Sequence, residues 1–323
     1  MSAHGMARTD AVLDLIMGHQ RLLLDPGGTH GDSCEHCRAA QRDKIDGHVR
    51  AGRAIPMLLP AFPAKSPNPD KVLGHLPDLA EELSVAFLEA LCVRVGEVYP
   101  PGAHLIICSD GRVFNDLVRI PDEHVSAYQR GMSDVLGRLG TAHISLYSLD
   151  DVFPGTDPAG MRRKLWADHA PDLEALRDEV RSGGPLLGLY RGITRFLYED
   201  AKIPGFRGSN ATLQRESRRR AYEVIGRSQA WGNLLAAIHP DAVRLSIHPQ
   251  PCGHEKFGIF LQDAGDEDRW LTPWHAVAVE DRGRFRLMKH RAAKDAGGRL
   301  VLRGGRPSHY VLAADHSTTS SKG

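Results

Sequence analysis

Residues 54–68 read AIPMLLPAFPAKSPN. The first part of this stretch, residues 54–62, is almost entirely apolar, which is typical of a strand that is buried on both faces of a sheet. The prolines that follow stiffen the next loop, so they hold Lys65 in place at the carboxyl end of the strand. In open α/β sheets, ligands bind beyond the carboxyl ends of the strands. This loop is therefore the first position at which we expect a functional site.

The segments on either side of this stretch indicate the fold class. Residues 103–108 and 143–147 predict two more strands, and Asp78 with Glu81 forms a capping box that opens a helix through about residue 95. Strands that alternate with helices are typical of a parallel sheet with crossover helices. Residues 158–239 read as mostly helical, and short strands dominate from residue 243 onward. We predict an α/β fold: a Rossmann-like parallel sheet with flanking helices, plus a smaller β-rich C-terminal region.

The predicted domain organisation has four parts. They are a helical or irregular segment at 1–53, a Rossmann-like α/β domain with its helical region at 54–240, a β-rich region at 241–314 and a disordered Ser/Thr-rich tail at 315–323. The strands expected in the β-rich region are 243–248, 256–261, 275–279, 284–289, 300–303 and 309–312.

Composition excludes several classes of protein. Hydrophobic residues make up 41% and charged residues 25% of the chain, and the net charge is +1, so no basic field indicates a nucleic-acid partner. No run approaches the about 18 consecutive apolar residues of a membrane span, and the N-terminus does not read as a signal peptide. Nucleotide-binding glycine motifs and the nucleophile-elbow motif are absent, which disfavours nicotinamide enzymes, P-loop kinases and α/β-hydrolases. We expect a cytoplasmic protein without a nucleic-acid or membrane partner.

Two lysines occupy the loop after the first strand. Lys65 can bind a phosphate as a point charge or form an imine with a ketone, and Lys71 follows closely. The alternative is that Lys65 is a solvated lysine in a proline-rich turn. If Lys65 grips a substrate, Lys65→Ala should abolish turnover with little loss of fold.

The second strand ends in Ser109-Asp110-Gly111-Arg112. Asp110 can accept a hydrogen bond from a substrate amine or hydroxyl, and Arg112 can clamp a phosphate. A local turn, in which Asp110 and Gly111 only satisfy the backbone geometry, explains the same residues equally well.

A pair of arginines lies in the helical region. Arg191 and Arg195 are four residues apart, so a helix places them on one face, where two guanidinium groups suit a carboxylate or a phosphate. The alternative is a surface ion pair between Arg195 and Glu199, which are also four residues apart.

The strand at 243–248 has one polar face. Period-two alternation places Arg244, Ser246 and His248 opposite three aliphatic side chains. If the following strands are its neighbours, Lys256 and His275 join this face, which can then hold an anion and supply a general base near neutral pH. A solvated sheet face would show the same alternation.

A weaker pattern concerns metal binding. Cys34 and Cys37 form a C-x-x-C pair with His30 nearby, which looks like half of a zinc site. A single pair is a weak signal, and Cys252 and His254 can join it only if the fold brings them there. We therefore predict no metal and no cofactor.

The same segments, in this order, resemble the isonitrile synthase family, also called the pyoverdine/dityrosine biosynthesis family. The most specific blocks are FPAKSPN at 62–68 and RLSIHPQ at 244–250. The supporting blocks are KVLG at 71–74, LPD at 76–78, SDGRVF at 109–114, YRG at 190–192, Arg227 with Trp231, KFGI at 256–259 and TPWH at 272–275. They span residues 55 to 290 and leave the first 50 and the last 30 residues uncovered.

The resemblance implies an enzyme that turns the α-amino group of tyrosine or tryptophan into an isonitrile, with ribulose 5-phosphate as the carbon donor. The amine attacks the sugar ketone at C2, a Schiff base forms, and this carbon is kept as the isonitrile carbon. No metal or redox cofactor is implied, and an iron/2-oxoglutarate oxygenase often processes the product as a pathway partner. Yeast relatives serve dityrosine precursor synthesis with formyl-type products. A formyl-forming or other amine-modifying enzyme, or a non-catalytic ligand-binding relative, therefore stays open.

The residue patterns and the resemblance together assign roles. Sugar-phosphate binding needs cations, the amino-acid carboxylate needs an arginine, and imine chemistry needs proton carriers. The predicted catalytic residues are Lys65, Asp110, His248 and His275. The predicted substrate-binding residues are Lys71, Arg112, Arg191, Arg195, Arg244, Ser246, Lys256, Phe62 and Trp274. Phe62, Trp231 and Trp274 can pack the substrate ring or belong to the core, and for Trp231 the core is favoured.

Overall fold

The computed structural model describes residues 3–22, 34–184, 186–262 and 271–312. His30 and the tail expected at 315–323 lie outside these ranges. Within these ranges, no helix combines the length and the apolar character needed to cross a membrane.

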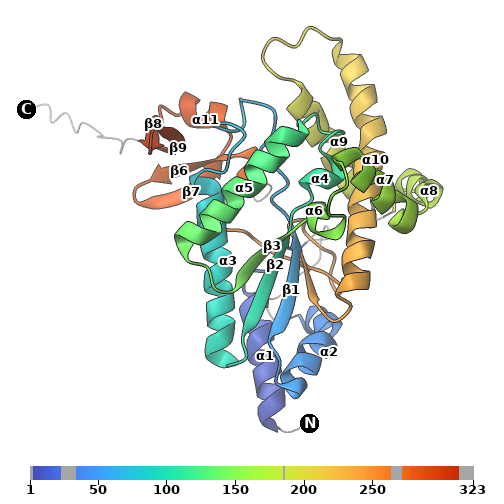
Figure 1. The fold of residues 1–323 in the computed structure, drawn as a ribbon, viewed down its shortest axis with the longest axis vertical. Helices are drawn as coiled ribbons and strands as arrows, with labels where there is room; N and C mark the ends of the chain where they lie inside the picture. Colours follow the sequence, from blue (N-terminus) through green and yellow to red (C-terminus); the bar gives the residue numbers. More distant parts are fainter. Residues whose placement is uncertain (1–2, 23–33, 185, 263–270, 313–323) are drawn as a thin grey trace, which may run out of the picture.

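A parallel sheet of five strands forms the centre of the molecule (Figure 1). In spatial order its strands are β3 (Ile144–Tyr147), β2 (Ala103–Cys108), β1 (Ile55–Pro60), β4 (Val243–Ser246) and β5 (Phe257–Gly258). Each neighbouring pair runs parallel. The predicted α/β class with a Rossmann-like parallel sheet is therefore confirmed.

Helices cover both faces of this sheet. The described helices of this part of the chain are α1 (Ala3–Met17), α2 (Glu35–Ala51), α3 (Leu79–Val98), α4 (Gly111–Phe114), α5 (Asp122–Leu139), α6 (Leu149–Val152), α7 (Pro158–His169), α8 (Leu173–Arg181), α9 (Leu186–Ala201) and α10 (Asn210–Ile238). Helix α3 begins at the capping box expected from the sequence: Asp78 accepts from the backbone of Ala80, and Glu81 accepts from the backbone of Asp78.

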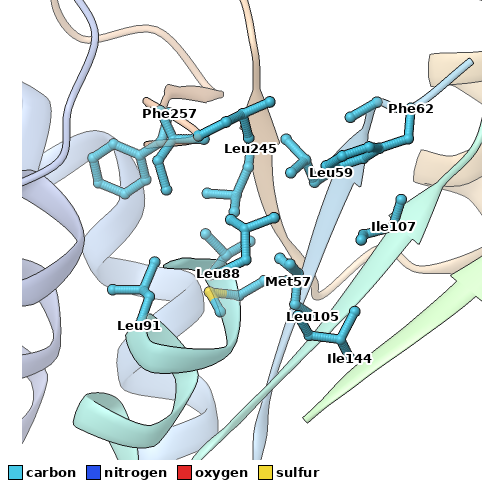
Figure 2. Packing of buried hydrophobic residues seen from close by; sticks show 14 of the residues in the cluster. Met57, Leu59, Phe62, Leu88, Leu91, Leu105, Ile107, Ile144, Leu245 and Phe257 are labelled. Atoms are coloured by element: carbon cyan, nitrogen blue, oxygen red, sulfur yellow. The ribbon is translucent and has the colours of Figure 1, made fainter. Parts of the chain in front are cut away.

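The main core lies between the sheet and α3. Figure 2 shows part of this core, in which strand side chains form one cluster with Leu88 and Leu91 of α3. The labelled strand side chains include Met57, Leu59, Leu105, Ile107 and Leu245. The opposite face packs against α10 and α7, where Leu58 and Cys108 contact Trp231. Trp231 is fully buried, and its indole N–H donates to the Cys108 carbonyl at 3.5 Å. Trp231 is therefore a core residue, as the sequence favoured.

A second, smaller sheet follows near the C-terminus. Its spatial order is β7 (Arg284–Met288), β6 (Val277–Asp281), β9 (Arg306–Val311) and β8 (Arg299–Arg303), and α11 (His290–Asp295) connects β7 to β8. Ala278 of β6 is buried against Leu79 and Ala80 of α3, so this sheet docks onto the helix that packs on the first sheet. The predicted β-rich C-terminal region is thus present as a mixed sheet.

Two details differ from the sequence expectation. Strands β4 and β5 belong to the five-stranded sheet, although the sequence grouped them with the C-terminal strands, because alternation does not tell which strands pair. His275 lies in a short 3-10 helix, η1 (Pro273–His275), and the strand begins at Val277. Proline at the start of η1 fixes the backbone in a turn.

Candidate active site

The sheet has its topological switch point between β1 and β4. From β1 the chain passes to β2 and then β3 on one side, whereas β4 and β5 lie on the other side of β1. The loops that leave β1 and β4 therefore diverge, and ligands of open α/β sheets bind in the crevice at such a point. The two loops are 62–68 and 247–256, which contain the two most specific blocks of the sequence.

The loop after β1 starts with a strained residue. Phe62 has φ 54°, a left-handed conformation that is unfavourable for a bulky side chain. Its carbonyl accepts from the Ser109 hydroxyl at 2.9 Å, and its ring meets the Trp274 ring edge-on at 5.3 Å. Both rings are buried, so they hold the loop against η1. This agrees with the alternative in which Phe62 and Trp274 belong to the core.

Lys65 is buried within a network of ion pairs. Its ammonium lies 2.9 Å from Asp78 and 2.8 Å from Glu81, and it donates to the Pro273 carbonyl at 3.0 Å. Burial alone would lower the pKa of Lys65, but the two carboxylates raise it, so the lysine stays charged. Burial also raises the pKa of Glu81, to about 7, and Glu81 accepts from the Tyr128 hydroxyl. Lys65 is therefore not the solvated lysine of the alternative interpretation: it joins the β1 loop, α3 and η1.

A second network is centred on Asp200, which sequence reasoning missed. Asp200 accepts from the Ser66 hydroxyl at 2.9 Å and pairs with the Lys71 ammonium, and its other oxygen lies 3.4 Å from His275 Nε2. Burial would raise the pKa of Asp200, but His275 and Lys71 hold it at about 2. The imidazole of His275 is fixed from its other side by the Thr272 hydroxyl at 3.2 Å. Contacts at both ring nitrogens therefore fix the orientation of the His275 imidazole beside a carboxylate.

The sequence carried little signal for this role of Asp200. It lies at the end of α9 beside Glu199, and its hydrogen-bond partner Ser66 is 134 residues away in the chain. The one available sign was an acidic residue on the apolar face of an amphipathic helix, close to its end.

Asp110 is a carboxylate for which no neighbouring cation is found in the described part of the chain. It follows β2 and precedes the first turn of α4, and its buried Oδ1 atom has no hydrogen-bond partner in the described part of the chain. Burial raises its pKa to about 7. Gly111 keeps it close to the β1 loop, because a Cβ atom at Gly111 would lie 2.0 Å from the Pro63 carbonyl oxygen. Asp110 can therefore both accept and donate a proton near neutral pH.

Arg112 supports the same region from behind. It pairs with Asp122 and Asp150, each at 3.2 Å, and donates to the Ser126 hydroxyl at 2.5 Å. The side chain is buried and its donors are used within the protein. This arrangement makes Arg112 a scaffold for the start of α5 and differs from the free phosphate clamp expected from the sequence.

The polar face of β4 continues onto β5. The sequence predicted this for the case in which the two strands are neighbours, and they are. The register pairs Leu245 with Phe257, which sets Lys256 beside Arg244. Arg244 lies 3.2 Å from Glu255, and the Ser246 hydroxyl accepts from the backbone of His248. Burial and the charge of Arg244 lower the pKa of Lys256, for which no side-chain partner is found within the described ranges.

His248 follows β4 at the switch point. Protein atoms surround its imidazole, although part of the residue is exposed to solvent. This burial, together with the charges of Arg21, Lys256 and His275, lowers the pKa of His248. The imidazole is therefore neutral at pH 7 and can take a proton.

The two arginines of α9 lie elsewhere. Arg191 and Arg195 are both exposed, and Arg195 Nε lies 3.0 Å from Glu199 with 79% of its side chain exposed. The surface ion pair that spacing also allowed is therefore present. The cavity of about 220 Å³ beside Arg130, Arg138 and Arg306 lies along α5, away from the residues described above.

The structure thus brings most of the predicted site residues to one edge of the sheet. Lys65, Lys71, Asp110 and His275 are joined through the 62–68 loop, and His248 and Lys256 lie across the switch point. Arg191 and Arg195 remain on a separate helix surface. The arrangement combines two proton carriers, Asp110 and His248, with the ammonium group of Lys256, which suits acid–base chemistry on an anionic substrate.

Comparisons with known proteins agree with this picture. The family described as pyoverdine/dityrosine biosynthesis protein matches residues 45–301. The L-tyrosine isonitrile synthase of Pseudomonas aeruginosa is 47% identical over 290 residues, which cover 88% of each chain. An L-tryptophan isonitrile synthase of Fischerella ambigua is 39% identical over 303 residues, which cover 94% of this chain and 91% of that one.

A solved structure extends the similarity to three dimensions. The crystal structure of the PvcA protein from Pseudomonas aeruginosa matches with a TM-score of 0.89 at 44% identity, and the match covers 95% of this chain and 100% of that chain. The relatives are named as enzymes that form isonitriles, so this chain is an enzyme of that kind. The chain belongs to the pyoverdine/dityrosine biosynthesis protein family.

Proposed function

We propose that this enzyme converts the α-amino group of an aromatic L-amino acid, tyrosine in preference to tryptophan, into an isonitrile with ribulose 5-phosphate as the carbon donor. The observation that carries the proposal is the identity to an L-tyrosine isonitrile synthase over 88% of both chains. Two tyrosine enzymes are 47% and 45% identical, and two tryptophan enzymes are 39% and 38% identical. This difference supports tyrosine as the preferred substrate.

The proton carriers at the switch point fit the first step. The amine nitrogen attacks the ketone carbon C2 of the sugar, a C–N bond forms, and water leaves to give the Schiff base. The step removes two protons from the amine nitrogen and delivers both to the oxygen, which departs as water. Asp110 has a pKa of about 7 and His248 is neutral, so one can hold a proton while the other takes one.

The remaining cations fit the sugar phosphate. Lys256 lacks a side-chain partner within the described ranges, and Arg244 beside it has an exposed partner, Glu255, which a phosphate can replace. His275 is held by Asp200 and supplies a second base.

The residues that are already fully paired take positioning roles in this proposal. Lys65 holds the β1 loop to α3 and η1, and Arg112 holds the start of α5. Arg191, exposed and without a side-chain partner in the described ranges, remains the candidate for the carboxylate of the amino acid.

The test is one incubation with labelled sugar. The purified enzyme is mixed with ribulose 5-phosphate that carries ¹³C at C2 and with L-tyrosine or L-tryptophan, and the products are read by mass spectrometry. We expect a tyrosine isonitrile that contains one ¹³C. A product heavier by one water is the formamide and supports the formyl-forming alternative. Absence of any product with both amino acids supports a ligand-binding relative.

Two lysine variants test the site assignment. Lys256→Met should raise KM for ribulose 5-phosphate more than KM for tyrosine, because it removes a phosphate cation. Lys289→Met is the matched control, since Lys289 makes a half-exposed ion pair with Glu199. If both variants behave as the wild type, Lys256 is not in the phosphate site. We also propose that a separate iron/2-oxoglutarate oxygenase takes the isonitrile product as its substrate.

A further inference from the structure

The fold brings a third cysteine to the C-x-x-C pair near the N-terminus. Cys252 Sγ lies 3.4 Å from Cys34 Sγ and 3.6 Å from Cys37 Sγ, although these residues are separated by 218 and 215 positions in the chain. All three sulfur atoms lie within 4.8 Å of one another. They form the one such group of three potential ligands found in the described part of the chain.

The spacing of the sulfur atoms suits a tetrahedral metal ion. Thiolates bound at about 2.3 Å to a tetrahedral zinc ion are about 3.8 Å apart, so the observed arrangement needs little adjustment. Three neighbouring thiolates repel one another without a cation, and thiolate sulfur favours zinc over magnesium or calcium.

The surrounding backbone is arranged as in a ligand site. Cys34 is the N-cap of α2 and Cys37 lies in its first turn, so both residues lie at the positive end of the helix. The backbone N–H of Gly253 donates to Cys37 Sγ at 3.5 Å, which is a typical contact that orients a thiolate ligand. Gly253 has φ 71°, and a Cβ atom there would lie 2.4 Å from His36 Nε2.

From this geometry we infer that Cys34, Cys37 and Cys252 bind a structural zinc ion. Three thiolates leave one position of the tetrahedron, which a water molecule or the imidazole of His36 can fill. The ion fastens the start of α2 to the 251–254 turn. This turn connects β4 to β5 and so lies between His248 and Lys256. The sequence predicted no metal, because Cys252 can join the Cys34–Cys37 pair only through the fold.

The first experiment measures metal in the purified enzyme, prepared without chelators or a metal-binding tag. Elemental analysis of the wild type should find about one zinc per chain, and Cys34→Ala and Cys252→Ala should lose most of it. Cys92→Ala is the matched control, because Cys92 is buried in α3 outside the cluster, and it should keep its zinc. Circular dichroism of each variant establishes that it is folded.

The second experiment uses the wild type alone and does not depend on the folding of a variant. The protein is stripped with a chelator under reducing conditions, its thermal midpoint is measured, and Co²⁺ is then added. We expect a lower midpoint after stripping and sulfur-to-cobalt charge-transfer absorption at about one equivalent of Co²⁺.

Several results would overturn the assignment. In the first experiment they are less than about a tenth of a zinc per chain in wild type supplied with zinc and reductant, iron in place of zinc, or a zinc content of Cys252→Ala equal to that of the wild type. In the second experiment it is absence of the cobalt absorption. A disulfide between two of these cysteines in the purified protein, found by peptide mass mapping without reductant, would also exclude the site. Enzymatic activity is not needed as a readout.

Discussion

Two buried aspartates at the active site have opposite pKa shifts. Asp110 has no cation beside it among the described residues, and burial raises its pKa to about 7. Asp200 is also buried, but His275 and Lys71 outweigh burial and hold its pKa at about 2. The first carboxylate can therefore exchange a proton near neutral pH, whereas the second stays ionised and orients His275. The same side chain serves as proton carrier or as anchor according to its neighbours.

The variant Asp110→Asn tests the raised pKa through stability. Between pH 4 and pH 7, native Asp110 keeps a proton that the unfolded chain has released, so its contribution to stability falls as pH rises through this window. Above pH 7 the buried charge costs about 4 kcal/mol relative to an ordinary aspartate. Asn cannot ionise, so the free energy of unfolding should fall less between pH 5 and pH 8 in the variant than in the wild type. Parallel curves from urea unfolding at the two pH values would contradict the shift. Turnover should fall as well.

A second residue-scale prediction concerns Lys65. The sequence suggested that loss of this lysine would abolish turnover with little loss of fold. Because Lys65 neutralises Asp78 and Glu81 in the interior, Lys65→Met should instead destabilise the protein by about 3–5 kcal/mol. Replacement of Lys289, whose pair with Glu199 is half-exposed, should change stability by less than about 1 kcal/mol. Chemical unfolding of both variants measures the loss of stability. Equally small losses in the two variants would show that the buried ion pairs contribute little to stability.

At the scale of elements, periodicity predicted the strands and helices well because burial imposes it. The strands expected at 54–62, 103–108 and 143–147 contain β1, β2 and β3. Which of these elements contact one another was not predictable in the same way. The sequence identified the capping box of α3 and Lys65 separately, but their meeting depends on how the β1 loop folds back over 13 residues onto Asp78. Asp200 and the buried state of Arg112 likewise depend on contacts between distant segments.

One element-scale contact is open to a direct test. The first turn of α4 touches the β1 loop at Gly111, where an added Cβ atom would meet backbone atoms of Pro63 at 2.0 and 2.9 Å. Gly111→Ala should therefore push the two segments apart, displace Asp110 and destabilise the protein by about 1–3 kcal/mol, with a larger loss of turnover. Gly137→Ala in α5 is the control, since nothing lies within 4 Å of its Cβ position. Replacement of this helical glycine by alanine should stabilise the protein by about 0.5–1 kcal/mol. Equal thermal midpoints for the two variants would show that the close approach is unimportant.

At the scale of the whole molecule, the two sheets build the site together. The five-stranded sheet provides the loops with Lys65 and His248, whereas the segment that leads into the second sheet provides the Pro273 carbonyl and His275. The second sheet is held to α3 by a small apolar contact of Ala278 with Leu79 and Ala80. Activity should therefore depend on a docking surface that contains no catalytic group.

This dependence can be tested by placing a charge in the docking surface. Ala278 is fully buried, so Ala278→Asp places a carboxylate among apolar side chains and should cost about 3 kcal/mol or more. Leu302→Asp is the control, because Leu302 of β8 is 57% exposed and its replacement leaves the contact with α3 intact.

The expected outcome for Ala278→Asp is an early unfolding step of the second sheet, detected by limited proteolysis after about residue 270, together with loss of turnover. The five-stranded sheet has its own core between β1 and α3, so its circular dichroism should persist through this step. Retained turnover in a variant whose second sheet is cleaved would mean that His275 and Pro273 are dispensable. The site would then reduce to the residues of the first sheet, with His248 and Asp110 as its proton carriers.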